Sequence, residues 1–330
     1  MLRNNDVGDV LLATPLLSAL RRLFPAARIG VGVGHWSAPV LFGNPNIDEV
    51  LAVSAPWFNR YAPDAGILGR IAYILRSPEI STVRAQAFEI GIDVLGSGWG
   101  SLFLIRSGIP WRLGVRGYAG GHTGASLTIP YRPDVHVARF GLGFAETLGA
   151  RWLPDPRPQV FLAPDERDAA EKLWGSRSGP RVLLAPGGGL PQKCWPMVRY
   201  ADLATALAAH GIASAVLLGP KERGAKEAFP RTSRHFVDLG LRQAFAAVAA
   251  ADCVVTSPSM VLHAAAAFER PCLVLLGPAW SSTLAHDRQW GYPGLSATLG
   301  PEPGQRGIAD GPEALKGTLR LIEALRVAAS

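Results

Sequence analysis

A glycine-rich turn holds the residue types best suited to bind a phosphorylated ligand. The turn reads Ala185-Pro-Gly-Gly-Gly-Leu-Pro-Gln-Lys-Cys-Trp-Pro196 and lies between a predicted buried strand, 182–185, and a predicted helix, 197–210. Consecutive glycines leave backbone N–H groups free to approach a ligand closely. Lys193 precedes a helix N-terminus, which favours anions. We therefore predict a phosphate site, the alternative being a plain strand-to-helix turn.

Asp9 is the second candidate for chemistry. It stands in Val7-Gly-Asp-Val-Leu-Leu-Ala-Thr-Pro15 and opens a predicted helix that runs to about Phe24. Open α/β sheets bind ligands at the carboxyl ends of their strands, and a carboxylate here faces that side. A helix N-terminus keeps such a group ionised, as a general base requires. The alternative interpretation is that Asp9 only caps the helix.

The elements that position these residues alternate between short apolar runs and helical patterns, which predicts parallel α/β layers. In the first half we predict a helix at 10–20, strands at 29–33, 90–95 and 112–115, a helix end at 102–107, and an irregular insertion lining a cleft at 55–84. Three prolines within 154–158 predict a domain boundary, giving domains 1–157 and 158–330. The second domain has predicted strands at 159–162, 182–185, 213–218, 253–256 and 272–276, and helices at 165–174, 197–210, 243–251 and 259–268. A final helix at 312–329 is long enough to reach back to the first domain.

Composition excludes several classes of protein. The chain has 330 residues, 48% hydrophobic and 18% charged, which fits a globular protein of two domains. Its net charge of +7 is spread over both halves without basic clusters, so we expect no nucleic-acid partner. A mild positive excess suits an anionic substrate or an acidic membrane surface. No apolar run reaches the ~18 residues that a membrane helix needs.

Two further patterns place the chain in the cytoplasm. The apolar segment 10–20 is not typical of a signal peptide, because Asp6 and Asp9 precede it and two arginines follow it. The three cysteines, Cys194, Cys253 and Cys272, lack metal-ligand spacing. We expect them to be reduced and mostly packed.

Three segments in this order resemble the signature regions of glycosyltransferase family 9, the ADP-heptose:lipopolysaccharide heptosyltransferases. They are Leu2-Arg-Asn-Asn-Asp-Val-Gly-Asp-Val-Leu-Leu-Ala-Thr-Pro15, Pro186-Gly-Gly-Gly-Leu-Pro-Gln-Lys-Cys-Trp-Pro196 and His263-Ala-Ala-Ala-Ala-Phe268. The resemblance covers nearly the whole chain. It implies a GT-B fold, in which two Rossmann-like domains with parallel sheets face each other across a cleft. The first domain would bind the acceptor and the second the nucleotide sugar.

The resemblance also implies roles for individual residues. Asp9 matches the proposed base of an inverting reaction without a metal or other cofactor, and this sequence has no Asp-x-Asp pair of the kind that holds a metal. The implied acceptor contacts are Gly8 and Thr14. The implied donor contacts are Gly187, Gly188, Gly189, Lys193, Glu222, Ser259, Met260 and His263. For Glu222 the alternative is a solvated carboxylate at a helix start, and for His263 it is a buried core histidine.

The sequence departs from the family at two places. Heptosyltransferases usually read Asp-Thr-Gly or Asp-Ser-Gly where this chain has Pro258-Ser-Met260, so the carboxylate that would hold sugar hydroxyls is missing. Only Met1, Leu2 and Arg3 precede the first loop, where a strand of about five residues is expected. Either the true start of the protein lies upstream of Met1, or the central strand is truncated.

We predict a transferase that moves a sugar, heptose by resemblance, from a nucleotide donor such as ADP to a lipopolysaccharide-core or other lipid-linked or anionic glycan acceptor. The resemblance places it in the cytoplasm of a bacterium, with peripheral contact to the inner membrane. The alternative is a nucleotide-sugar-binding or scaffold protein of the same fold that has lost catalysis. A GT-B epimerase or phosphorylase is a third possibility, but we find no additional acid/base carboxylates for an epimerase.

Overall fold

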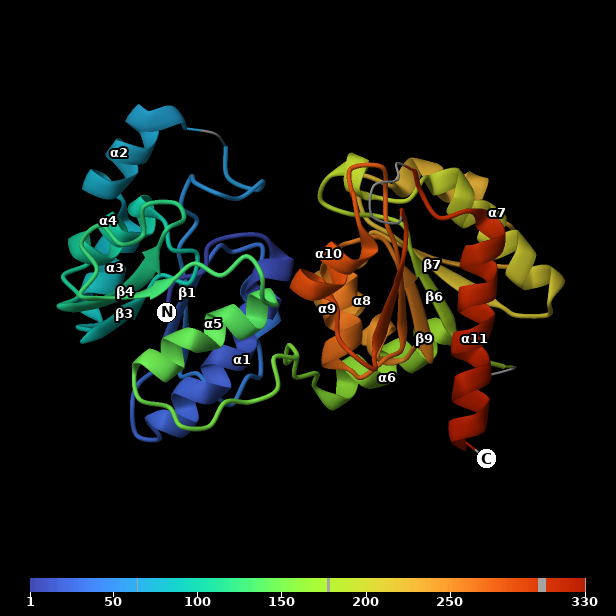
Figure 1. Cartoon of the computed structure of the whole chain (residues 1–330), viewed down its shortest axis with the longest axis horizontal. Helices are drawn as coiled ribbons and strands as arrows, with labels where there is room; N and C mark the ends of the chain where they lie inside the picture. Colours follow the sequence, from blue (N-terminus) through green and yellow to red (C-terminus); the bar gives the residue numbers. More distant parts are fainter. Residues whose placement is uncertain (64, 177–178, 302–306, 330) are drawn as a thin grey trace. The chain divides into compact units, whose positions relative to one another are not determined.

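The computed structural model describes residues 1–63, 65–176, 179–301 and 307–329. It divides into two compact units, Met1–Phe161 and Leu162–Ser330 (Figure 1). The dividing point lies close to the boundary predicted from the prolines at 154–158. Within the described residues every pair of named strands is parallel, as the alternation of apolar runs and helical patterns predicts.

The first unit contains two groups of short parallel strands. One pairs β1 with β2, and the other has the order β3-β4-β5. The strands are β1 (Gly30–Val33), β2 (Glu49–Ala52), β3 (Ile90–Ile92), β4 (Trp111–Arg116) and β5 (Leu127–Pro130). Strands β2 and β5 were absent from the sequence prediction, since neither is a continuous apolar run.

Residues 1–3 join the two groups of strands. Leu2 forms parallel bridges with Gly32 on one side and Asp93 on the other. Its N–H donates to the Ile92 carbonyl at 2.8 Å, and the Arg3 N–H donates to the Gly32 carbonyl at 2.9 Å. The Leu2 side chain is only 2% exposed. Three residues therefore fill the central place of this sheet, where a longer strand was expected.

Helices α1 and α5 pack together in the first unit, and α2, α3 and α4 accompany the β3–β5 group (Figure 1). The helices are α1 (Val7–Leu23), the 3₁₀ helix η1 (Ala38–Leu41), α2 (Gly66–Arg76), α3 (Pro78–Ala85), α4 (Gly98–Arg106) and α5 (Val137–Thr147). The prediction that 55–84 is irregular was wrong, because it contains α2 and α3. The signal for α3 was present: Ser77 accepts the Glu79 N–H, and Pro78 occupies the first helical position.

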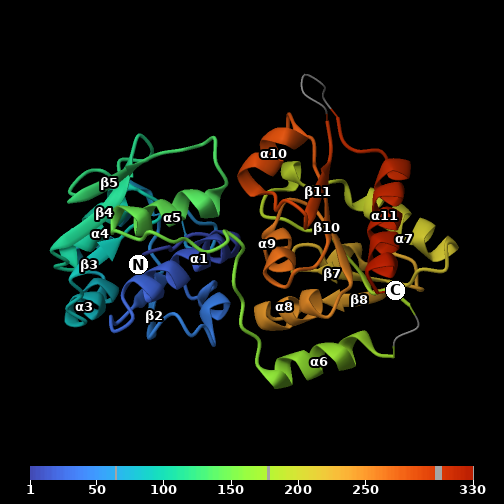
Figure 2. The ribbon, with the colours of Figure 1, turned by 60° about the horizontal axis from the view of Figure 1, so that its bottom comes forward.

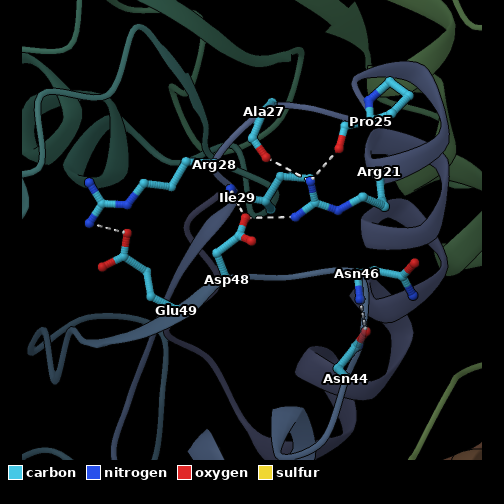
Figure 3. A network of polar contacts seen from close by, with 9 residues as sticks. All are labelled: Arg21, Pro25, Ala27, Arg28, Ile29, Asn44, Asn46, Asp48 and Glu49. Atoms are coloured by element: carbon cyan, nitrogen blue, oxygen red, sulfur yellow. Dashed lines mark hydrogen bonds and ion pairs between the residues drawn. The ribbon is translucent and has the colours of Figure 1, made fainter.

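A network around Asp48 fixes the turn between α1 and β1 (Figure 3). The Arg21 Nη2 and the Ile29 N–H both donate to Asp48 Oδ2 at 2.6 Å. Arg21 Nη1 also donates to the Ala27 carbonyl at 2.6 Å. The Ile29 hydrogen bond, followed by that from Arg21, holds the pKa of Asp48 below its usual value. These contacts fix the path of the chain from α1 into β1.

The second unit is built on a sheet with the order β11-β10-β9-β6-β7-β8 (Figure 2). The strands are β6 (Val182–Ala185), β7 (Ser214–Leu218), β8 (Arg234–Val237), β9 (Cys253–Thr256), β10 (Cys272–Leu275) and β11 (Ser296–Leu299). Strands β6, β7, β9 and β10 are fully buried, as expected for parallel strands with both faces covered. The predicted strand at 159–162 was wrong. There the Gln159 N–H donates to Thr14 Oγ1 of α1 at 2.8 Å, and no strand forms.

Helices cover this sheet on both sides (Figure 2). They are α6 (Pro164–Trp174), η2 (Pro191–Lys193), α7 (Met197–Ala209), η3 (Arg223–Ala228), α8 (Leu241–Ala249), α9 (Met260–Ala267), α10 (Thr283–Trp290) and α11 (Gly311–Ala329). Helix α11 packs on α7 and β10 of its own unit. Its predicted reach to the first domain stays a prediction. Among the described helices, none is long and apolar enough to cross a membrane.

Candidate functional site

The glycine loop, Gly187–Gly189, leaves the carboxyl end of β6 and meets two other segments of the second unit. A methyl group on Gly187 would lie 2.9 Å from the Glu222 carboxyl carbon. One on Gly188 would lie 2.6 Å from Cys194 Sγ and 3.5 Å from the Pro258 carbonyl oxygen. The loop is half-exposed on its other side. Chain segments that follow β6, β7 and β9 thus converge on a backbone that has no room for side chains.

Lys193 lies in η2, before α7 as predicted, and is half-buried. The Gly277 N–H donates to its carbonyl at 3.0 Å, and the Ala279 N–H donates to the Gln192 carbonyl at 2.9 Å. Its ammonium stands 5.4 Å from the centroid of the Trp280 ring. Such a position over an aromatic face attracts a cation. The lysine is therefore held at a defined place beside the glycine loop, and Trp280 is a neighbour that the sequence pattern did not reveal.

Buried hydroxyl groups stabilise the chain beneath the loop. Thr256 Oγ1 donates to the Ala185 carbonyl at 3.1 Å, which ties the end of β9 to the end of β6. Ser257 Oγ accepts the Trp195 N–H at 3.1 Å and lies 3.1 Å from the Tyr200 hydroxyl. Trp195 is 1% exposed and packs in the core of the second unit. Hydrogen bonds of this kind give a site a fixed geometry.

Ser259, Met260 and His263 lie at the start of α9. Ser259 is the N-cap, and its hydroxyl accepts the Val261 N–H at 3.2 Å. Met260, which is half-buried, is the first helical residue. His263 is 6% exposed, and its Nδ1 lies 2.8 Å from the Tyr292 hydroxyl. This histidine is a buried, hydrogen-bonded residue, which matches the alternative interpretation of it, and a role toward a ligand stays a prediction.

Glu222 stands at the start of η3, where no side-chain cap forms. Its carboxylate instead lies against the backbone of Gly187 and Gly219, within 3.1 Å of where a methyl group on either would stand. The residue is half-exposed. Glu222 is thus a carboxylate at a helix start, as the alternative interpretation has it. It also borders the glycine loop, where a donor contact would lie.

In the first unit Asp9 is the third residue of α1, which begins at Val7, two residues earlier than predicted. Asp9 is therefore not the N-cap, and that alternative was wrong. Its Oδ1 accepts a hydrogen bond from Arg3 Nη2 at 2.8 Å. The Arg3 side chain is 8% exposed and that of Asp9 is 30% exposed. Because Arg3 follows the central bridge of the sheet, the ion pair fixes the carboxylate against the sheet while leaving one edge accessible.

The two predicted acceptor residues differ in accessibility. Gly8 is half-exposed beside Asp9. Thr14 is fully buried; its hydroxyl donates to the Leu11 carbonyl at 2.7 Å and accepts the Gln159 N–H at 2.8 Å. Both functions of this hydroxyl are therefore used within the unit. Its position makes Thr14 a structural residue, and we leave it out of the proposed acceptor contacts.

Asp93 is a buried charge that sequence reasoning missed. It lies at the end of β3 beside Leu2, and its Oδ2 accepts the Ser97 N–H at 2.8 Å. A methyl group on Gly100 would lie 2.1 Å from the same oxygen, so α4 rests directly on the carboxyl group. Burial raises the pKa of Asp93 to about 6, against the Ser97 hydrogen bond and Arg3, which lower it. An aspartate directly after an apolar run and before Gly96-Ser-Gly98 was the available signal.

The cysteines and possible metal ligands complete the description of the site. All three cysteines are free thiols; Cys194 is half-buried beside Gly188, and the other two are buried. Burial raises the pKa of Cys253 to about 12. Across residues 1–63, 65–176, 179–301 and 307–329 there is no group of three or more His, Cys, Asp or Glu side chains arranged to hold a metal ion.

Comparisons with known proteins agree with this architecture. The family model of glycosyltransferase family 9 (heptosyltransferase) matches residues 80–284, more than half of the chain. Lipopolysaccharide heptosyltransferase 2 of Escherichia coli (strain K12) is 25% identical over 295 residues, which cover 83% of this chain and 80% of that protein.

Two solved structures are similar over nearly their whole length. The family 9 glycosyltransferase from Veillonella parvula has a TM-score of 0.80 at 17% identity, covering 99% of this chain and 96% of that one. The E. coli ADP-heptose lps heptosyltransferase II has a TM-score of 0.75 at 21% identity, covering 99% and 98%. These likenesses confirm the predicted α/β, GT-B fold class.

Proposed function

This chain belongs to glycosyltransferase family 9, and on that premise we propose that it transfers a heptose from ADP-heptose to a lipopolysaccharide-core or related lipid-linked glycan acceptor. The similar proteins that carry this activity in their names support the choice of sugar and acceptor. We further propose that it works in the cytoplasm, at the face of the inner membrane where such an acceptor is accessible.

The observation that carries the proposal is the convergence on the glycine loop in the second unit. The half-exposed backbone of the loop and Lys193 belong to the connection between β6 and α7, and the Glu222 carboxylate reaches the loop from the segment after β7. Backbone N–H groups and a fixed cation bind a diphosphate. A carboxylate accepts hydrogen bonds from sugar hydroxyls, so Glu222 would bind the nucleotide ribose. We assign Gly187, Gly188, Gly189, Lys193 and Glu222 to the donor, with Ser259, Met260 and His263 bordering it.

Asp9 is the proposed general base, and Gly8 lies beside the acceptor. The acceptor hydroxyl loses its proton to Asp9 as its oxygen attacks the anomeric carbon. The bond from that carbon to the phosphate oxygen breaks, and the electron pair leaves with the nucleoside diphosphate. Attack opposite the leaving group inverts the anomeric centre. Arg3, which contacts Asp9 at 2.8 Å, is a positioning residue for the carboxylate.

We propose that the reaction needs no metal ion. The departing nucleoside diphosphate gains one negative charge as the bond breaks, and fixed donors stabilise this charge best when they are oriented before the reaction. The hydrogen bonds that hold η2 to Gly277 and Ala279 provide such preorganisation for Lys193. Turnover in excess EDTA equal to turnover in its absence would support this part of the mechanism.

A specific observation keeps a second function in consideration, namely a nucleotide-sugar-binding protein without catalysis. At Pro258 the family's carboxylate is replaced, and the Pro258 carbonyl oxygen faces Gly188 instead. A carbonyl group offers one neutral acceptor oxygen where a carboxylate offers two charged ones, so the sugar is held less firmly. Mass-spectrometric detection of a glycosylated acceptor would separate the two functions, since the binding protein forms none.

The donor assignment is tested by calorimetry with ADP, GDP, UDP and CDP on Lys193→Ala. Loss of one charge-assisted contact of about 1.5–3 kcal/mol weakens ADP binding roughly ten- to hundredfold. Lys172→Ala, which removes an exposed lysine from α6, is the matched control and should bind ADP as the unaltered chain does. Equal ADP affinity in the two variants would remove Lys193 from the donor site.

A further inference from the structure

Helix α2 carries its large apolar side chains on the side that faces solvent. Ile67, Leu68, Ile71 and Leu75 are 66%, 78%, 41% and 56% exposed. Their spacing places them on one face of the helix, since residues three and four apart are neighbours. We call these four residues the apolar stripe. A helix of a soluble domain normally buries such a face, so this stripe is an exposed apolar patch that requires a partner.

The side of α2 that adjoins the stripe is anchored, which fixes the orientation of the stripe. Ile74 is 6% exposed, and the Tyr73 ring meets Trp57 edge-on at 5.2 Å. The Tyr73 hydroxyl donates to Glu79, and Arg106 Nε of α4 donates to the Ile74 carbonyl at 3.4 Å. Turning the stripe inward would break these contacts. Helix α2 lies at the edge of the first unit (Figure 1), and its stripe is exposed.

Positive charge borders the stripe. The segment Gly66–Arg76 contains two arginines, Arg70 and Arg76, and no acidic residue. The neighbouring carboxylate of Glu79 accepts hydrogen bonds from the Ser54 N–H at 2.9 Å and from Tyr73. An apolar face bordered by arginines matches a surface that is apolar within and anionic at its edge.

We propose that the apolar stripe docks the first unit on an anionic lipid bilayer. The stripe enters the boundary between headgroups and acyl chains, and Arg76, at the last position of α2, contacts lipid phosphates. The helix has 11 residues, so it lies in the plane of the surface instead of crossing it. Phe58 and Tyr61, about half exposed on the segment before α2, are side chains that favour a membrane interface.

The charge pattern favours lipid over a second copy of this chain. A two-fold dimer places the same patch on both partners opposite itself. The arginines around α2 would then face arginines, and like charges opposed at an interface disfavour association. A bilayer of acidic lipids supplies the opposite charge. The inference rests on the proposed function only in that a lipid-linked acceptor gives the protein a reason to bind a bilayer. Binding to lipid itself requires no turnover.

Sedimentation with vesicles tests the proposal. We expect the full chain to bind vesicles of phosphatidylglycerol and phosphatidylcholine and to bind pure phosphatidylcholine much less. Leu68→Ser combined with Leu75→Ser should weaken this binding at least tenfold. Leu284→Ser combined with Val327→Ser removes side chains that are 60% and 76% exposed in the second unit, and it is the matched control that should bind unchanged.

The contribution of charge is measured separately. Arg76→Gln should weaken binding to the anionic vesicles about fivefold, since a basic residue near such a surface contributes about 1 kcal/mol. A tryptophan introduced as Leu68→Trp should be quenched by brominated acyl chains, which reports insertion at the stripe itself. Unquenched fluorescence in the presence of bound vesicles would show that another surface binds them and would overturn the proposal.

Two further results would also overturn it. One is equal vesicle binding by the stripe variant and its control, and the other is a dimer in solution that the stripe variant abolishes, seen by light scattering. The outcome for the proposed function is independent. Absence of transfer to a detergent-solubilised acceptor, with stripe-dependent vesicle binding intact, refutes the transferase and leaves the docking surface standing.

Discussion

Both units are built on parallel strands, but the continuity of the sheet differs between them. The second unit has a continuous parallel sheet whose inner strands are buried on both faces, and its candidate site is made mainly of backbone. The first unit closes its sheet through the single bridge residue Leu2, and its candidate site is a pair of charged side chains, Arg3 and Asp9.

The two units also differ in how much apolar surface they expose. Among the described residues, fifteen of the nineteen exposed large apolar side chains belong to the first unit. A rigid backbone loop suits a small ligand with fixed geometry, such as a nucleoside diphosphate. An exposed apolar surface suits a large or lipidic partner. The difference agrees with our proposal that the second unit binds the donor and the first the acceptor, a division that can be tested experimentally.

The strongest test of the division is Asp9→Asn. The amide keeps the size of the side chain but accepts no proton, so turnover should fall roughly 10²- to 10⁴-fold. Binding of ADP, which we assign to the second unit, should stay unchanged by calorimetry. Asp48→Asn is the control, since it alters a carboxylate of the same unit that only fixes the turn before β1. If Asp48→Asn lowers turnover as much as Asp9→Asn does, Asp9 is a structural residue and the division fails.

The buried charge of Asp93 should make the stability of the first unit depend on pH. Its pKa of about 6 in the folded chain exceeds the usual 3.8, so the folded state binds more protons between these values. Stability therefore falls as pH rises from about 4 to about 6 and then levels off, by about 3 kcal/mol in all. Hydrogen exchange of the β3 and α4 amides measures this loss.

Asp93→Asn serves as the comparison, because its amide oxygen can still accept the Ser97 N–H while carrying no charge. The difference in unfolding free energy between the two proteins should change by about 3 kcal/mol from pH 4 to pH 7, in favour of the variant at the higher pH. Exchange in β6 and β9 should show no such difference. A pH-independent difference in β3 and α4 would mean that Asp93 titrates as an ordinary carboxylate.

The smallest expected effect concerns the rigidity of the glycine loop. Gly188→Ala places a methyl group 2.6 Å from Cys194 Sγ, so the loop must shift, at a cost of about 1–3 kcal/mol. ADP affinity should fall about tenfold. Adding Cys194→Ala removes the sulfur atom and should restore most of that affinity. If the double variant binds no better than Gly188→Ala, the loop tolerates movement and the second unit is less rigid than its contacts indicate.

The four inner strands of the second unit could be predicted from the sequence, because they are mostly apolar runs, whereas the edge strands β8 and β11 carry exposed or half-exposed side chains and were not predicted. Strands β6 and β9 were predicted with their observed bounds. In the first unit, β2 and β5 carry exposed or half-exposed side chains and give no such signal. The region 55–84 was predicted to be irregular because it contains proline, glycine and scattered aromatic residues. The apolar residues of α2 do recur at helical spacing, but their side chains face solvent.

The residues of the candidate site likewise divide into those that a local sequence pattern reveals and those that it does not. The glycine loop and Lys193 were visible in the sequence because glycine and a cation at a strand-to-helix junction have a physical reason to be there. The neighbours Arg3, Asp93 and Trp280 were not found. Each acquires its role through a contact with a distant part of the chain, such as the bridges on either side of Leu2, and no local pattern encodes such a contact.

The central place of residues 1–3 also bears on how the first unit folds. Leu2 is made before either of its partners, Gly32 and Asp93, so its pairing is highly non-local and closes a long loop. During synthesis the segment can pair with β1 early, but its bridge to Asp93 cannot form until β3 has left the ribosome. The sheet beneath the Arg3–Asp9 contact is therefore complete only when two segments about 60 residues apart have both paired with the N-terminus.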